Sequence, residues 1–393
     1  MSVTATATRS QQLPVSATAP AQRLASLDVI RGAVMVLMAI DHVRVYSGVP
    51  AGGPTAGVFL TRWVTHFCAP AFVFLAGTAA YLHGSKVGRA ALAKYLATRG
   101  VLLVVLELTL IHVMWTFTFD FTQLLAGVIW MLGWCMILMA ALIQLPTRAI
   151  TTFGLITIFG QNILYFLANA TPSQLRWIWQ FVYLGGQVKI GESLTITVLY
   201  SIVPWIGVMA VGYAFGAIVV REAPERRRLS LRIGVPATAL FLVVGILVVY
   251  LQGAQDGAPP ALFRLLNQQK YPASQLFLLM TLGPTIAVVP LAEGATRYLG
   301  RVLQTLGRVP MFYYLLHIPL IHATALVVWL IRDGAVNSAR FTTAPYVSIP
   351  AAQRWNLPLL YLVFVVDVAI LYLLCRWYAE IKTRRPQAWM RYV

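Results

Sequence analysis

Ionisable side chains occupy both ends of one apolar segment near the start of the chain. The segment 27–46, LDVIRGAVMVLMAIDHVRVY, carries Asp28 and Arg31 near one end and Asp41 and His42 near the other. Ionisable groups inside hydrocarbon are costly unless they are paired or face water, and they commonly mark functional sites. One helix would then bring titratable chemistry toward both faces of a membrane. An enzyme that acts across the membrane needs this arrangement, whereas a passive anchor does not.

Further titratable residues occur in other apolar segments. They are His66 in the segment 58–82, Arg99, Glu107 and His112 in 94–118, and His317 and His322 in 309–331. Imidazole titrates near neutral pH and suits general-base work. A carboxylate at the depth of Glu107 must be protonated or paired, which predicts a buried network. His317 and His322 are five residues apart and do not share a helical face, so we predict no metal site.

Several of these residues have a structural interpretation beside the functional one. Asp28 and Arg31 are three residues apart, so they can form an ion pair on one helical face, or Arg31 can meet an anionic cofactor that enters from the cytoplasm. His66 can be a hydrogen-bonded residue of the bundle or a functional one. Arg99 can extend its side chain so that the guanidinium group lies at the membrane–water interface. Gly77 and Gly212 are typical of close helix packing.

The composition indicates a membrane protein with an all-α fold. The chain has 393 residues, of which 59% are hydrophobic and 11% charged, whereas a soluble domain has about a quarter charged residues. Apolar runs near the length of a bilayer span recur throughout, and they predict a polytopic bundle of about ten transmembrane helices. The predicted spans are 27–46, 58–82, 94–118, 122–145, 148–168, 195–220, 231–251, 274–293, 309–331 and 357–379.

The basic residues predict the orientation of this bundle. They concentrate in the loops and tails on one side, which places both termini in the cytoplasm and the chain in the cytoplasmic (inner) membrane. This explains the net charge of +18 without a nucleic-acid partner. Residues 1–22 are interpreted as a disordered cytoplasmic tail, 23–380 as the transmembrane domain and 381–393 as a basic cytoplasmic tail. The oligomeric state is not determined, and a homodimer stays open.

Five segments together resemble a known family. They are RLASLDVIRGAVMVLMAIDHVRVYSG, THFCAPAFVFLAGTAAYL, LELT, PWIGVMAVGYAFG and GRVPMFYYLLHIPLIH, within residues 23–325. They resemble the bacterial DUF1624 family, which is grouped with the catalytic region of the lysosomal heparan-α-glucosaminide N-acetyltransferase among transmembrane acyltransferases. The most specific motif is LDxxRG followed by DH.

The resemblance implies acetyl transfer across the membrane. Acetyl-CoA would enter from the cytoplasm, and a sugar or glycan acceptor would lie on the other side of the lipid bilayer. The implied catalytic residues are His42 as general base or acetyl carrier, Asp41 to orient it, and Glu107 and His317 to shape the cavity; the implied CoA-binding residues are Asp28, Arg31 and Arg99. The lysosomal enzyme has its proposed histidine in the loop after the first helix. That loop here, SGVPAGGPTAGV, has none, so His42 or His66 would take the role.

Two other functions stay open at this point. One is a proton-coupled membrane transporter, in which Glu107 and the histidines relay protons. The other is a non-catalytic assembly protein that binds lipid or a partner. A basic cavity open to the cytoplasm and leading toward an outer acceptor site would favour the enzyme, whereas a continuous alternating-access path would favour the transporter.

Overall fold

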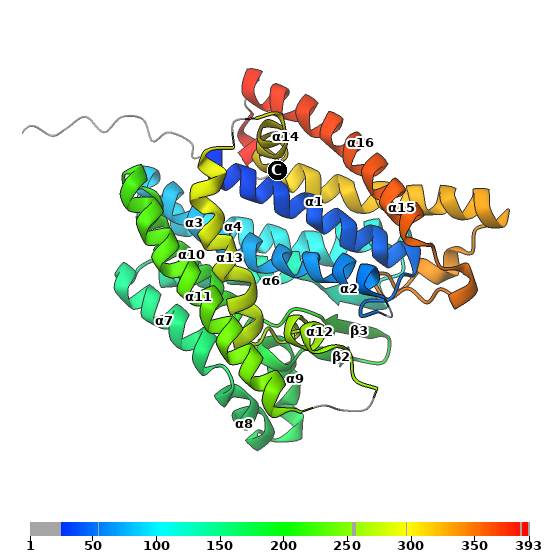
Figure 1. Cartoon of the computed structure of the whole chain (residues 1–393), viewed down its shortest axis with the longest axis horizontal. Coiled ribbons are helices and arrows are strands. Elements are labelled where there is room, and N and C mark those ends of the chain that lie inside the picture. Colours follow the sequence, from blue (N-terminus) through cyan, green and yellow to red (C-terminus); the bar gives the residue numbers. More distant parts are fainter. Residues whose placement is uncertain (1–24, 54, 254–256, 296, 386, 392–393) are drawn as a thin grey trace, which may run out of the picture.

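Helix α1 (Ala25–Ser47) runs through the middle of the molecule (Figure 1). The structure is a computed structural model that describes residues 25–53, 55–253, 257–295, 297–385 and 387–391, so the predicted tail 1–22 lies outside the described residues. Helix α1 packs against α3, α13, α14, α15 and α16. A helix with neighbours on all sides is expected to be apolar around its whole circumference. The residues of α1 between its charged ends fit this expectation, because they are apolar.

The other elements follow in chain order. The helices are α2 (Ala56–Trp63), α3 (Cys68–Val87), α4 (Arg89–Leu106), α5 (His112–Thr116), α6 (Val128–Leu142), α7 (Thr147–Gly160), α8 (Ile163–Ala170), α9 (Arg176–Trp179), α10 (Trp205–Val219), α11 (Ala223–Leu251), α12 (Ala261–Leu266), α13 (Gln275–Glu293), α14 (Tyr298–Arg308), α15 (Pro310–Asp333) and α16 (Leu357–Arg384). The strands are β1 (Gln123–Ala126), β2 (Gly186–Ile190) and β3 (Leu194–Val198). Short 3₁₀ or π segments are η1 (Val64–Phe67), η2 (Glu107–Ile111), η3 (Ser173–Leu175), η4 (Gln180–Leu184), η5 (Ser338–Phe341), η6 (Ala351–Gln353) and η7 (Ala388–Arg391).

Within the described residues, six helical stretches are long and apolar enough to cross a membrane. They are Ala56–Val87, Arg89–Thr116, Ala223–Leu251, Gln275–Glu293, Pro310–Asp333 and Leu357–Arg384. The pair α7 and α8 makes a seventh if it counts as one span. Helices α6 and α10 are apolar but shorter, and α1 has the length but carries charged residues at both ends. The chain is a helical membrane protein, and ten spans with cytoplasmic termini stay a prediction.

The fold is mostly helical, as predicted, but it also contains a three-stranded sheet, which lies where two spans were predicted to begin. Strand β3 pairs with β1 in parallel and with β2 antiparallel, in the order β1-β3-β2. The predicted spans 122–145 and 195–220 are therefore wrong at their starts, since their helices begin only at Val128 and Trp205. The physical reason is that a short apolar run is compatible with strand or helix, and the β-branched run LTITV favours a strand.

Two other predicted spans contain breaks. The span 148–168 is bent by 69° between Gly160 and Ile163, where the polar Gln161 and Asn162 interrupt the apolar run. The span 58–82 contains the 3₁₀ segment η1, which precedes Pro70 instead of following it. Pro70 is the third residue of α3, where a missing backbone N–H is tolerated because the first turn has no helical acceptor for it.

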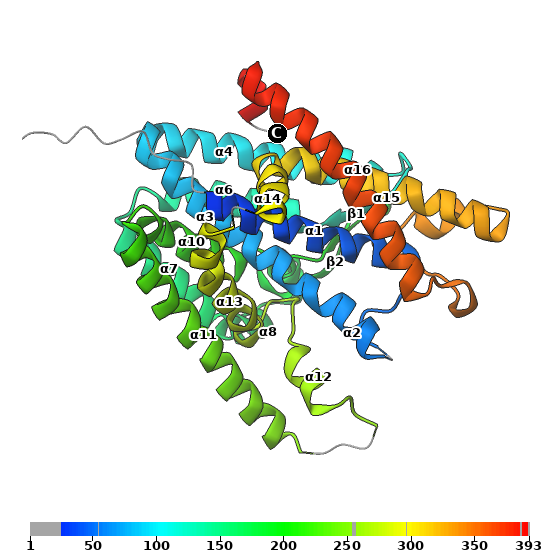
Figure 2. The same cartoon turned by 45° about the horizontal axis from the view of Figure 1, so that its top comes forward.

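Small residues bring α3 and α10 into close contact. A Cβ atom on Gly77 would overlap the carbonyl oxygen of Met209, and one on Gly212 would overlap that of Phe74. The hydroxyl of Thr78 donates a hydrogen bond of 2.9 Å to the carbonyl of Gly212. The packing role predicted for the two glycines is confirmed. Figure 2 shows the neighbouring pair α4 and α6 close together, and these helices also pack against each other.

We expect Gly77→Val to destabilise the α3–α10 contact. The added side chain meets backbone atoms, which cannot rotate away, so overpacking should cost about 1–3 kcal/mol or more. Thermal unfolding of the detergent-solubilised protein measures this as a lower Tm. Gly52→Val is the matched control, because a Cβ atom on Gly52 meets nothing within 4 Å. Equal Tm values for the two variants would contradict this assignment.

Candidate active site

A cavity of about 400 Å³ opens where several helices end. Arg31 of α1, Arg99 of α4, Arg308 at the end of α14 and Lys382 of α16 contribute to its lining. Most of the remaining lining is apolar and comes from α3, α4, α6 and α15. The start of α1 and the end of α16 thus lie at the same end of the bundle, which we call the basic end. Arg31 and Arg99 were selected from the sequence, whereas Arg308 and Lys382 were placed only among the basic residues of the cytoplasmic loops and tails.

The LDxxRG motif joins α1 to α14 and places Arg31 at this cavity. The Nη1 of Arg31 donates to Oδ1 of Asp28 at 3.0 Å and to the carbonyl oxygen of Gly307 at 3.1 Å. A Cβ atom on Gly32 would overlap the carbonyl oxygen of Leu303, and one on Gly307 would overlap that of Asp28. The predicted ion pair three residues apart is confirmed. The motif therefore has a packing function as well as a charge at the cavity.

Tyr314 of α15 marks the inner limit of the cavity. It is a lining residue, whereas His42 and His317 are not. The ring of Tyr314 lies edge-on to that of His317, with 5.1 Å between the centroids. Its carbonyl oxygen lies 2.6 Å from Nδ1 of His317. Tyr314 thus lines the basic cavity and also contacts His317.

His42 of α1 and His317 of α15 form a hydrogen-bonded pair. The Nδ1 of His42 lies 2.7 Å from Nε2 of His317. His317 is fully buried, whereas His42 is partly exposed. The indole of Trp115 lies edge-on to the His42 ring, with 4.7 Å between centroids, and limits its rotation. The structure brings together two predicted residues that are 275 positions apart in the sequence.

The hydrogen-bond partners of this pair determine where its protons lie when both rings are neutral. A carbonyl oxygen only accepts hydrogen bonds, so Nδ1 of His317 donates to Tyr314. The Nε2 of His317 is then unprotonated and accepts from Nδ1 of His42. The Nε2 of His42 consequently carries the lone pair. Within the described residues it has no hydrogen-bond partner, so it can take a proton from a reacting group.

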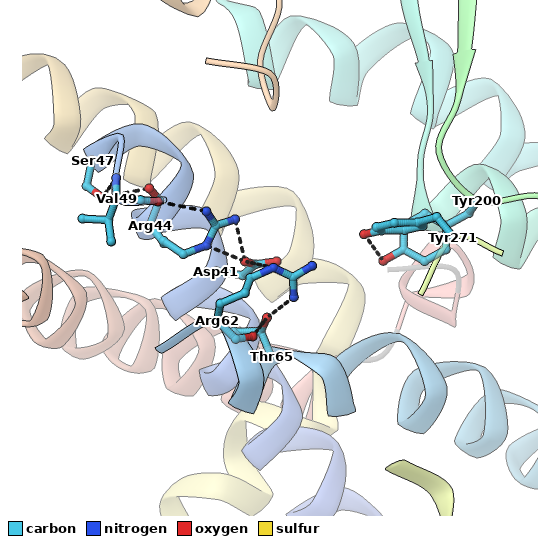
Figure 3. A network of polar contacts seen from close by, with 8 residues as sticks. All are labelled: Asp41, Arg44, Ser47, Val49, Arg62, Thr65, Tyr200 and Tyr271. Atoms are coloured by element: carbon cyan, nitrogen blue, oxygen red, sulfur yellow. Dashed lines mark hydrogen bonds and ion pairs between the residues drawn. The ribbon is translucent and has the colours of Figure 1, made fainter. Parts of the chain in front are cut away.

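Asp41 is held by arginines and not by His42. The Nε and Nη2 atoms of Arg44 donate to its Oδ1 at 3.1 Å and 3.0 Å. The Nε of Arg62, from α2, lies 4.0 Å from the same oxygen. Figure 3 shows both guanidinium groups directed at Asp41. His317, not Asp41, makes the hydrogen bond to the His42 ring. Neither arginine was selected from the sequence, although the spacing of three between Asp41 and Arg44 is the one that predicted the Asp28 pair.

His66 and Glu107 are buried, and within the described residues they make no hydrogen bond to the pair. The Nδ1 of His66 has no partner among the described residues, and its ring lies edge-on to Phe277 with 5.4 Å between centroids. The carboxyl group of Glu107 faces the start of α6, where a Cβ atom on Gly127 would overlap its Oε1. The backbone N–H groups of Gly127, Ile129 and Trp130 interact with this carboxyl group. Glu107 thus complements the dipole of α6.

The other histidines in the predicted spans pack against neighbours. His322 stacks on Tyr46 and Phe117, with centroid distances of 4.7 Å and 3.8 Å. The Nε2 of His112 lies 2.6 Å from the carbonyl oxygen of Asp120. In the part of the chain that the structure describes, no three His, Cys, Asp or Glu side chains gather as ligands for a metal ion.

The comparison with protein families agrees with the resemblance of the motifs. Residues 23–253 match the family described as "Heparan-alpha-glucosaminide N-acetyltransferase, catalytic". This match covers more than half of the chain and includes Arg31, His42 and Glu107, whereas His317 lies beyond it. No curated protein matches the chain. The chain belongs to the family of the heparan-α-glucosaminide N-acetyltransferase catalytic region, whose members are membrane acetyltransferases.

Proposed function

We propose that the protein is a membrane enzyme that moves an acetyl group from cytoplasmic acetyl-CoA to the amine or hydroxyl of an extracytoplasmic sugar. The observation that carries this proposal is the hydrogen-bonded pair of His42 and His317, which leaves a basic nitrogen on the partly exposed ring. The family and the basic cavity support the same function. The proposal also places the protein in the cytoplasmic membrane, as the sequence predicts.

His42 acts as the general base in this proposal. As the acceptor nitrogen or oxygen attacks the thioester carbon, its proton passes to Nε2 of His42. The new bond to the acetyl carbon forms, the C–S bond breaks, and the proton then passes to the departing thiolate. His317 positions His42, because its Nε2 accepts a hydrogen bond from Nδ1 of His42. The same hydrogen bond stabilises the His42 ring while that ring carries a positive charge. A base positioned in this way contributes about 10²–10⁴-fold to the rate.

The basic cavity fits the acetyl donor. Acetyl-CoA supplies a thioester at the end of a long, largely uncharged arm, and phosphate groups at the other end. Arg31, Arg99, Arg308 and Lys382 supply positive charge, and guanidinium groups bind phosphate oxygens in a bidentate way. The apolar lining between them and Tyr314 suits the arm. Because Tyr314 lines the cavity whereas His42 does not, side chains at this boundary have to move before the thioester meets His42.

We expect His42→Ala to lower acetyl transfer by about 10²–10⁴-fold, since the general base is removed. The measurement uses the purified protein in liposomes with radiolabelled acetyl-CoA and glucosamine as acceptor. His322→Phe is the matched control, because it removes a histidine of α15 while keeping a ring that can stack on Tyr46. If the His42→Ala variant transferred acetyl at the wild-type rate, His42 could not be the general base.

His317 should affect the rate through His42 and not through substrate binding. We expect His317→Phe to lower kcat by at least about ten-fold with little change in KM for acetyl-CoA, since the acceptor for the Nδ1 proton is lost. His317→Gln offers a side-chain oxygen to the same proton and should restore part of the rate. A purely packing role predicts the opposite order, with Phe the better substitute, and steady-state kinetics decide between the two.

Arg99 should contribute to donor binding. We expect Arg99→Gln to raise KM for acetyl-CoA by about ten-fold with kcat nearly unchanged, because one charge-assisted contact to phosphate is lost. Higher salt should weaken donor binding in the wild type more than in the variant. Arg148→Gln, an exposed position at the start of α7, is the control. An unchanged KM in Arg99→Gln would place the phosphates elsewhere.

A further inference from the structure

A second cavity, of about 220 Å³, lies at the end of α15 that is remote from the basic end. We call it the end cavity. Its lining includes Trp329 and Asp333 in the last turns of α15, and Asn337, Arg340 and Gln353 in the segment that leads to α16. Figure 1 shows the end of α15 and this segment extending beyond the other helices. The 24 residues of α15 span about 36 Å, so the end cavity and the basic cavity lie toward opposite membrane surfaces.

The inner wall of the end cavity is fixed by packing. Phe341 lines it and is 2% exposed. The ring of Phe341 lies 5.7 Å from that of Tyr46 and 5.3 Å from that of His322, measured between centroids. On another side, the Nη1 of Arg332 donates to the carbonyl oxygen of Gln353 at 3.5 Å. Helices α1 and α15 therefore determine the shape of the cavity together with the segment that covers it.

The end cavity has buried hydrogen-bonding atoms of both kinds without partners. The Nε1 of Trp329 is a donor and the Oε1 of Gln353 is an acceptor, and neither has a hydrogen-bond partner in the described part of the chain. Trp329 is 3% exposed. Buried polar atoms are normally hydrogen-bonded, because leaving them without a partner is costly. These two atoms therefore indicate a ligand that both accepts and donates hydrogen bonds.

Charges of opposite sign line the same cavity. Asp333 and Arg340 are both lining residues, and among the described residues neither side chain makes an ion pair. The Cζ of Arg340 lies 5.7 Å from the ring centroid of Trp329, so its positive charge is close to the indole donor. These two groups suit an anionic oxygen. Asp333 and the Oε1 of Gln353 accept hydrogen bonds, so they suit an ammonium group.

A phosphoethanolamine group matches this distribution. Its phosphate carries anionic oxygens, and an ethylene unit separates them from an ammonium group that has three N–H donors. A quaternary ammonium group, as in phosphocholine, has no N–H and cannot satisfy the Oε1 of Gln353. The end cavity therefore favours a primary amine beside a phosphate.

Apolar side chains next to the end cavity indicate that this headgroup belongs to a lipid. Val327, Leu330 and Ile331 of α15 are 54%, 53% and 77% exposed. Leu330 is three residues before Asp333, so the two are neighbours on the helix surface. Exposed aliphatic side chains on a helix long enough to span a bilayer are suited to contact acyl chains. A free sugar or amino acid would leave this apolar surface unused.

We propose that the end cavity binds a phospholipid with a primary ammonium group, such as phosphatidylethanolamine. Arg340 and Trp329 hold the phosphate, and Asp333 and Gln353 hold the ammonium group, while the acyl chains lie along the exposed side of α15. Charge-assisted hydrogen bonds are stronger than neutral ones, so the two charged ends supply both affinity and orientation. The site is separate from the histidine pair and does not depend on the proposed acetyl transfer.

The test compares two lipids of the same net charge. Native mass spectrometry of the full-length protein in detergent measures the binding of phosphatidylethanolamine and phosphatidylcholine with identical acyl chains. We expect phosphatidylethanolamine to bind at least about ten-fold more tightly, because only its ammonium group donates hydrogen bonds. Gln353→Leu should reduce this preference. Asp333→Asn should lower the affinity for phosphatidylethanolamine by at least about ten-fold. Glu192→Gln, an exposed carboxylate between β2 and β3, is the matched control and should change nothing.

Equal affinities for the two lipids in the wild type would overturn the inference. Tight binding of phosphatidylethanolamine that survives in Asp333→Asn would also overturn it, because the lipid would then occupy another place. Water-soluble glycerophosphoethanolamine tests the contribution of the acyl chains, and binding as tight as that of the lipid would contradict a lipid site. Displacement of the lipid by glucosamine at equal concentration would assign the cavity to a sugar instead.

Discussion

An ionisable side chain among apolar helices must find a partner, and α1 meets this constraint through other parts of the chain. At one end Arg31 binds the backbone of Gly307. At the other end His42 binds His317, and Asp41 is held by Arg44 together with an arginine of α2. These contacts attach α14, α15 and α2 to one central helix. The same pairing that makes the charges tolerable also sets the distance between the two ends of the proposed reaction path.

Local spacing predicted those partners that are close in the sequence. The Asp28–Arg31 pair follows from helical geometry, because residues three apart lie on one face. The pairing of His42 with His317 could not be predicted in this way, since it depends on how α1 and α15 pack in three dimensions. Composition predicted a membrane protein and most of its helices. It did not predict the sheet, because the residues of β3 are apolar enough for either structure.

Glu107 illustrates why a buried charge is an ambiguous signal. Its depth in an apolar segment predicted a buried network, and the structure gives its carboxyl group backbone N–H partners. In the structure its carboxyl group faces the first turn of α6, where Gly127 leaves room for it. Unpaired N–H groups at a helix start attract a carboxylate, so a buried carboxyl group can be explained without a substrate. The partner was invisible in the sequence because α6 begins after a strand that the apolar pattern concealed.

The position of Tyr314 between the basic cavity and the two histidines has a consequence for the cell as well as for the enzyme. A protein that admits one substrate from each side of a bilayer risks becoming a pore for protons and ions. In the proposed reaction, the contact between the rings of Tyr314 and His317 would help to keep the two aqueous compartments apart while no substrate is present. Group transfer can then take place within the membrane without dissipating the electrochemical gradient across it.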